Sequence, residues 1–130
     1  MPREHEFDLP VRYYETDAQG IVHHSNYLRY MELARVELLK STGYDYAKIE
    51  EAGVLLVVAK ATVSYKSPAR YGDTLRIWIR TERAFGARID HRYVIKVGER
   101  LVAEAETTIA SIDREGRVQR IPRELEIDDQ

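Results

Sequence analysis

The chain has 130 residues, of which 44% are hydrophobic and 32% are charged, and this length is typical of a single domain, expected here over residues 1–130. The formal net charge is −2 and there is no cysteine, which excludes disulfides and cysteine-ligated zinc and argues against a basic surface for nucleic acid or anionic membranes. The N-terminus lacks the apolar stretch of a signal peptide, and no run approaches the about 20 apolar residues of a membrane span, so a cytoplasmic protein without membrane insertion is expected.

The first elements predicted along the chain are a strand and a long helix. Residues 7–11 are mainly apolar and indicate the strand, and a polar stretch at 15–19 follows it. From Tyr27 to Leu39 apolar residues recur at helical spacing. They cover most of the girth of the helix, which predicts that it is buried on several sides.

Helix-terminating residues mark the ends of this helix and of a second, shorter one. Ser25 or Asn26 can cap the start of the long helix, and Gly43 suits its end. A short helix is expected over 46–52, with Asp45 as its N-cap and Gly53 as its stop.

Beyond residue 54 the apolar period becomes two, which predicts strands. Residues 54–66 form a long run rich in β-branched residues, and alternating runs follow at 75–80, 88–97 and 101–109. Gly98 and Glu99, between the last two runs, are typical of a tight hairpin turn. The order strand, helix, short helix and four strands predicts an α+β fold, with an antiparallel sheet of five or six strands around one long helix.

Two motifs carry a resemblance to a known family. Residues 13–35 read YYETDAQGIVHHSNYLRYMELAR, in which an Asp, two residues, a Gly and then an aromatic residue or His precede a helix. Residues 63–75 read VSYKSPARYGDTL, a strand followed by a turn with Pro and Gly-Asp. Over about residues 7–121 the chain resembles the hotdog-fold acyl-CoA thioesterases of the 4-hydroxybenzoyl-CoA thioesterase branch, including the small bacterial thioesterases associated with the Tol-Pal system. The resemblance implies a hotdog fold and hydrolysis of an acyl-coenzyme A with a short-chain aliphatic or aromatic acyl group.

The resemblance assigns the reactive carboxylate to Asp17, as nucleophile or as general base. A backbone N–H near His24 would polarise the thioester carbonyl, because a helix start offers unpaired N–H groups and the positive end of the helix dipole. Gly20 would let the chain turn closely between these two parts. Tyr27, in the first helical turn, is expected either to line the pocket or to pack in the core.

Cations are expected near the phosphates of coenzyme A. Lys66 and Arg70 are the candidates, because they flank Pro68 in the second motif. No cofactor is expected, since the coenzyme A thioester is itself the substrate. The adjacent His23 and His24 raise the hypothesis of a metal site, but neighbouring side chains diverge and no spaced ligand set accompanies them, so no metal is expected.

The helix carries an alternative to Asp17. Some hotdog thioesterases place the catalytic carboxylate on the helix, and Glu32 would then be the reactive group. Otherwise Glu32 and Arg35 are expected to pair on the helix surface or at a subunit contact. His91 is expected in the core or at a subunit contact.

The chain is expected to assemble with copies of itself, and two other functions compete with thioester hydrolysis. The edge strands of such a sheet and the resemblance imply a homo-oligomer, either a dimer or a homotetramer. A hotdog dehydratase or hydratase acting on acyl-CoA or acyl carrier protein is the competing enzyme, and a non-catalytic acyl-CoA-binding protein is the competing binder. An acyl carrier protein as partner and the identity of the acyl chain are left open by the residues.

Overall fold

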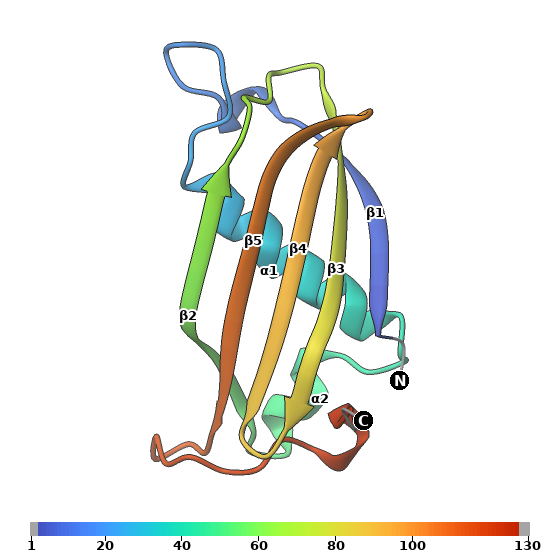
Figure 1. Cartoon of the computed structure of the whole chain (residues 1–130). Coiled ribbons are helices and arrows are strands. Elements are labelled where there is room, and N and C mark those ends of the chain that lie inside the picture. The colour runs from blue at the N-terminus through green and yellow to red at the C-terminus, as the bar shows by residue number, and fades with distance from the viewer. Residues whose placement is uncertain (1–2, 128–130) are drawn as a thin grey trace.

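A five-stranded antiparallel sheet curves around the long helix α1 (Asn26–Lys40), as Figure 1 shows. The structure is a computed structural model that describes residues 3–127. In chain order the elements are β1 (Glu4–Pro10), the 3-10 turn η1 (Tyr13–Glu15), α1, α2 (Tyr46–Glu51), β2 (Leu55–Tyr65), β3 (Thr74–Phe85), β4 (Arg88–Val97), β5 (Arg100–Ile112) and the 3-10 turn η2 (Arg123–Leu125). The predicted α+β arrangement is confirmed, with the sheet at the lower of the two expected strand numbers.

The strands lie in the order β1-β3-β4-β5-β2, and every neighbouring pair is antiparallel. Strands β3, β4 and β5 follow one another as hairpins, and Gly86 and Gly98 occupy their turns at positive φ. Strand β2 is an exception, because it pairs with β5 at the far edge of the sheet and not with β3. The connection 66–73 therefore passes over one end of the sheet, where it reaches the segment that precedes α1.

The side of the sheet that faces α1 is apolar. Alternate residues of β3, β4 and β5 are buried, as their period of two predicts, whereas the residues of β2 are mostly exposed. The members of this main core that lie on α1 are Tyr27, Tyr30, Met31, Ala34 and Leu38. The helix is exposed along one side, where Leu28 is 50% exposed. No helix among residues 3–127 is both long and apolar enough to cross a membrane.

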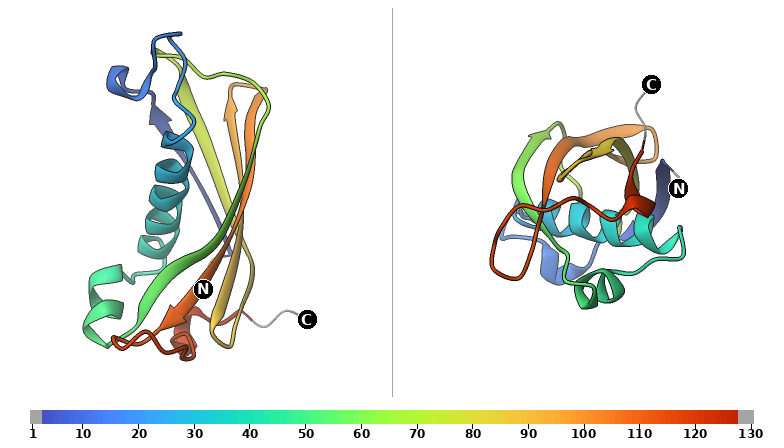
Figure 2. Two further views of the ribbon diagram at one scale, coloured as in Figure 1. Left: turned by 90° about the vertical axis from the view of Figure 1, so that its left-hand side faces the viewer. Right: turned by 90° about the horizontal axis from the view of Figure 1, so that it is seen from below.

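A second, smaller core closes the opposite end of the molecule. There α2, the β3–β4 hairpin and η2 come together below α1, as the view from below in Figure 2 shows. Asp45 caps α2 as predicted, and its side chain accepts a hydrogen bond from the Lys48 N–H at 2.9 Å. Ser25 occupies the predicted N-cap position of α1, but its side chain makes no capping hydrogen bond.

A polar cluster interrupts the main core between α1 and the sheet. Arg35 donates from Nη1 to the Tyr93 hydroxyl at 3.0 Å, and that hydroxyl lies 2.6 Å from Thr107 Oγ1. His91 is buried beside them, as expected, and its Nδ1 has no hydrogen-bond partner in the described part of the chain. The predicted surface pair of Glu32 with Arg35 is wrong, because the Arg35 guanidinium is buried against Tyr93 and no ion pair joins these two residues within 3–127.

The buried His91 predicts a loss of stability in acid. Burial and then the nearby Arg35 charge, offset in part by Asp90, lower the pKa of His91 from 6.5 to about 3. Between these two pH values the unfolded chain binds a proton that the folded chain does not, so the free energy of unfolding falls as pH falls. One proton accounts for up to about 1.4 kcal/mol per pH unit.

We expect the His91→Gln variant to lose less stability than the parent between about pH 6.5 and about pH 4, because it lacks this proton uptake. Urea unfolding of both proteins at the two pH values measures the difference. Equal losses in the two proteins would contradict the assignment.

Candidate functional site

Asp17 begins a tight turn that leads the chain toward α1. Its backbone N–H donates to the Ile21 carbonyl, and its own carbonyl accepts from the Gly20 N–H, both at 2.9 Å. Its side-chain Oδ1 accepts from the Gln19 N–H at 2.8 Å and from the Ile21 N–H at 3.4 Å. Gly20 has φ +80°, a conformation that is strained for a residue with a Cβ. The turn therefore holds the carboxylate through one oxygen, and Oδ2 makes no hydrogen bond with residues 3–127.

The two sequence motifs lie side by side. Ile21 and Arg70 form an isolated antiparallel β-bridge, and the Val22 N–H donates to the Ala69 carbonyl at 2.8 Å. Both segments occupy the same end of the sheet (Figure 1). The second motif thus supports the turn of the first through backbone contacts, and it brings Arg70 next to that turn. Lys66 lies at the end of β2, where its N–H donates to the Val102 carbonyl and its side chain is exposed.

The start of α1 presents a backbone donor. The His23 N–H donates to the Glu15 carbonyl, whereas the His24 N–H has no acceptor in the described part of the chain. The His24 carbonyl accepts from the Tyr27 N–H at 3.2 Å and from the Tyr65 hydroxyl at 3.4 Å. A free N–H beside the positive end of a 15-residue helix favours an anion or a developing oxyanion.

The two histidine rings stack on one another with centroids 4.2 Å apart. His23 Nδ1 lies 2.8 Å from Ser25 Oγ and also accepts from the Ser25 N–H at 3.2 Å. His23 is therefore engaged at the helix start. Across residues 3–127 no three histidine, cysteine or acidic side chains are grouped so that they could hold a metal ion.

Glu15 holds this segment in place, and the sequence analysis did not single it out. Its buried carboxylate accepts from the Arg12 N–H at 2.8 Å, from Arg12 Nη1 at 3.3 Å and from the Tyr30 hydroxyl at 3.0 Å. Its carbonyl accepts from Asn26 Nδ2 at 2.9 Å. Burial, and next the hydrogen bond to Glu15, raise the pKa of Tyr30, so this hydroxyl stays protonated as a donor. The network ties the segment before Asp17 to the first two turns of α1.

Aromatic side chains form the wall behind the helix start. Tyr27 is 3% exposed and makes edge-to-face contacts with Tyr30 and Tyr65, with centroids 5.6 and 5.3 Å apart. Burial raises the pKa of Tyr27, followed by the effect of Tyr65. The position of Tyr27 thus fits the core alternative. Tyr65 is 52% exposed and also contacts the His24 ring, but nothing in its local sequence marks it as a site residue.

Arg100 is the second side chain that sequence reasoning missed. From the β4–β5 hairpin its Nη1 donates to Ser67 Oγ at 2.8 Å and to the Pro68 carbonyl at 2.6 Å. Its Nη2 lies 3.7 Å from Asp73 Oδ2. Arg100 therefore fixes the second motif from a distant part of the sequence, and a hairpin arginine gives no local signal of this role.

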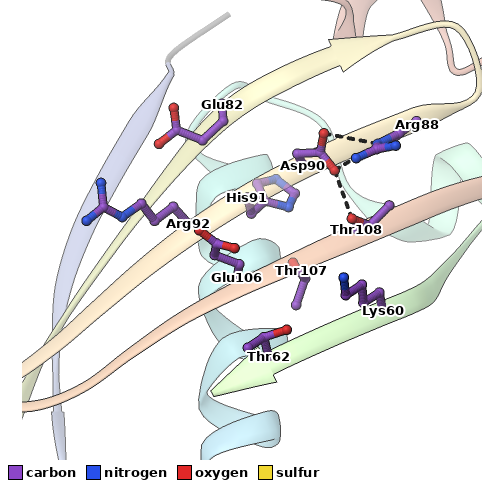
Figure 3. A pocket seen from close by; sticks show the side chains of 10 residues that line it. All are labelled: Lys60, Thr62, Glu82, Arg88, Asp90, His91, Arg92, Glu106, Thr107 and Thr108. Atoms are coloured by element: carbon purple, nitrogen blue, oxygen red, sulfur yellow. Dashed lines mark hydrogen bonds and ion pairs between the residues drawn. The ribbon is translucent and has the colours of Figure 1, made fainter. Parts of the chain in front are cut away.

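Another hollow lies on the face of the sheet away from α1 (Figure 3). It measures about 490 Å³ and is lined by Lys60, Thr62, Glu82, Arg88, Asp90, His91, Arg92, Glu106, Thr107 and Thr108. Asp90 is already engaged by Arg88 Nε at 3.0 Å and Thr108 Oγ1 at 2.9 Å. The charged side chains that line this hollow are of both signs, and no carboxylate among them faces the end of a helix. The Asp17 turn remains the better candidate for a reactive site.

Comparison with known proteins agrees with these features. The model of the thioesterase-like superfamily matches residues 11–127. The acyl-CoA thioester hydrolase YbgC of Escherichia coli O157:H7 is 34% identical over 110 residues, covering 82% of each chain. A chloroplastic acyl-acyl carrier protein thioesterase of Arabidopsis thaliana is 31% identical over 128 residues, covering 96% of this chain and 67% of the relative. The crystal structure of a probable thioesterase from Bartonella henselae has a TM-score of 0.87 and 32% identity, covering 92% of this chain and 99% of that one.

Proposed function

The chain belongs to the thioesterase-like superfamily, and from this we infer that it is an acyl-CoA thioesterase in which Asp17 supplies the reactive carboxylate. The hotdog fold and the thioester hydrolase class that the two motifs predicted are both confirmed by this membership. The part played by each site residue is our proposal.

One observation carries the proposal. The Asp17 turn leaves carboxylate oxygen Oδ2 unpaired within residues 3–127, and the same turn leads directly to the free His24 N–H at the start of α1. A thioester bound between them would meet a nucleophile or base on one side and an oxyanion donor on the other.

Two routes of hydrolysis use these groups equally. In the first, Oδ2 attacks the carbonyl carbon, the C–S bond breaks, the departing thiolate takes up a proton, and water then cleaves the acyl-aspartyl anhydride. In the second, Oδ2 accepts a proton from water as that water attacks, and the thiolate leaves with a proton. In both routes the His24 N–H stabilises the charge that develops on the carbonyl oxygen.

The remaining site residues take supporting parts in the proposal. Gly20 supplies the left-handed residue of the Asp17 turn, and Tyr27 packs in the core behind the helix start, where it supports Tyr65. Arg70, bridged to Ile21, and Lys66, at the end of β2, are the proposed cations for the coenzyme A phosphates.

We also propose that the protein is a homo-oligomer, a dimer or a homotetramer. Strand β2 is an edge strand of 11 residues, and its Val57 and Val58 side chains are 39% and 52% exposed. A long, apolar and unpaired edge is a ready template for a second strand. A second copy of the chain is the proposed occupant of this edge.

A second substrate carrier is supported by one observation. The Arabidopsis relative is named as a thioesterase for acyl-acyl carrier protein, and the free carboxylate and N–H of the site would meet the same thioester group on either carrier. Acyl carrier protein is therefore the second candidate partner, after coenzyme A.

A panel of thioesters tests the proposed function. Short aliphatic, long aliphatic and aromatic acyl-CoAs, and one acyl carrier protein thioester, are incubated with the protein while free thiol and carbon–carbon double bonds are both followed. We expect stoichiometric free thiol and free acid from at least one acyl-CoA. Double-bond formation or hydration without thiol release would identify a dehydratase or hydratase, and tight binding without turnover on the whole panel would identify a binding protein.

A further inference from the structure

A groove of about 280 Å³ lies between α1 and the edge strand β2. Leu28, Glu32 and Arg35 line it from one face of the helix, at positions i, i+4 and i+7. Val58 and Ala61 line it from β2. Because Leu28 belongs to the first turn of α1, the groove starts near His24 and follows the helix away from it.

The groove has apolar walls and a polar far end. Leu28, Met31, Val58 and Ala61 form the walls, Arg29 and Glu32 add charged groups along the helix, and Arg35 and Thr107 make the far end polar. A small adjoining cavity of about 20 Å³ is lined by Arg35, His91 and Tyr46 among others. The far end therefore has a guanidinium group, hydroxyl groups and an imidazole close together.

The Arg35 charge has no ion-pair partner among residues 3–127. Arg35 is 8% exposed, its hydrogen bond goes to the neutral Tyr93 hydroxyl, and no carboxylate of residues 3–127 lies within ion-pair distance of it. Glu32 lines the same groove, but it is exposed and forms no ion pair with Arg35 in this part of the chain. Burying a charge without a partner is costly. His91 adds a buried Nδ1 that also lacks a partner among these residues.

We propose that the groove binds the acyl chain and that Arg35 binds a carboxylate at the far end of that chain, so that the preferred substrates are ω-carboxyacyl thioesters. The proposal rests on the function proposed above, since it assumes that the thioester lies at the start of α1. The planar guanidinium fork matches a carboxylate with two parallel hydrogen bonds. Thr107 and His91 provide further polar contacts around the same point.

The position of Arg35 along the helix sets the length of the acyl chain. Arg35 lies about 16 Å beyond His24 along the axis at 1.5 Å per residue, and its side chain leans back toward the helix start. Three successive covalent bonds of an extended chain span about 3.8 Å. The distance left between the His24 N–H and the Arg35 guanidinium suits an acyl chain of roughly eight carbons.

The test compares suberoyl-CoA with octanoyl-CoA, which have the same length and differ in the terminal carboxylate. We expect the parent protein to favour suberoyl-CoA in kcat/KM by about 10- to 100-fold, the range for a hydrogen bond to a charged group. The Arg35→Met variant should lose this preference, and Arg35→Lys should retain part of it. A purely structural role of Arg35 would lower hydrolysis of both substrates equally and leave the ratio unchanged.

Arg92→Met is the matched control, because it removes an arginine from the face of the sheet away from α1. It should keep the parent ratio. The ratio of the parent protein tests the proposal even if Arg35→Met does not fold, and a parent that does not favour suberoyl-CoA overturns it. An unchanged ratio in folded Arg35→Met also overturns the proposal. If the oligomer of this variant is weakened as well, Arg35 is neutralised by a second copy of the chain and not by the substrate.

Failure of this inference is distinct from failure of the proposed function. If the parent hydrolyses both substrates with equal kcat/KM, only the assignment of the groove is lost. If it releases no thiol from any thioester, the proposed function is lost as well.

Discussion

Replacing His24 with proline should slow thioester hydrolysis by about 10²- to 10³-fold, the usual cost of removing one oxyanion donor. The His24 N–H has no acceptor in the described part of the chain, so its removal breaks no hydrogen bond seen there. His24 also precedes the N-cap Ser25, so a proline there removes no hydrogen bond of the helix. The loss should appear in kcat, because the donor acts on charge that develops during the reaction.

His24→Ala is the matched control, since it removes the imidazole and keeps the N–H. We expect its loss of kcat to be at least about tenfold smaller than that of His24→Pro. Steady-state release of thiol from one acyl-CoA, with circular dichroism as a check on folding, measures both variants. Equal losses would assign the contribution to the imidazole, and full activity of folded His24→Pro would remove the helix start from the mechanism.

Local sequence patterns predicted the local structure well. The period-two runs became β3, β4 and β5, and the glycine turn at Gly98 became a hairpin. Asp45 became an N-cap, because a side chain that accepts from the N–H three residues later needs only its own neighbours. These features depend on residues close together in the chain, and a sequence records them directly.

Contacts between distant segments could not be predicted in the same way. The pairing of β2 with β5 and the hydrogen bond from Val22 to Ala69 join residues about 50 positions apart. Glu15 has the appearance of an ordinary polar loop residue until Arg12 and Tyr30 are seen to donate to its buried carboxylate. These pairings depend on how the layers pack, which period and capping do not encode.

Arg35 shows the same limit on the helix. Its spacing of three from Glu32 predicted a surface ion pair, since side chains at i and i+3 are neighbours on a helix. The structure instead buries the guanidinium against Tyr93 and Thr107 on β4 and β5. The burial of an arginine is decided by the polar groups on the sheet that it meets, and these lie about 60 residues away in the sequence.

Asp17 is marked as a site residue by its motif and not by local periodicity. Local reasoning finds a turn at Asp17 and Gly20, and the structure contains that turn. Periodicity alone gives no reason to prefer this carboxylate over Glu32 or Asp73. The preference came from the resemblance of the motif to a family, and the catalytic assignment remains a proposal.

The second large effect is expected at Asp17. Asparagine has almost the same shape, and its Oδ1 can keep the hydrogen bonds from the Gln19 and Ile21 N–H groups. The amide is a poor nucleophile and a poor base, so both routes of hydrolysis should fail together. We expect kcat to fall by at least about 10²-fold, with folding unchanged.

Glu32→Gln is the control for this substitution, because Glu32 is the alternative carboxylate on the helix. Its kcat should remain within about tenfold of the parent value. If Glu32→Gln collapses turnover and Asp17→Asn does not, the reactive carboxylate lies on α1.

The most direct measurement is the rate of thiol release from the best acyl-CoA of the panel by Asp17→Asn, beside its thermal unfolding curve. Our account predicts that turnover is nearly abolished in a protein whose Tm and oligomeric state match those of the parent. Hydrolysis at close to the parent rate by the folded variant would contradict it.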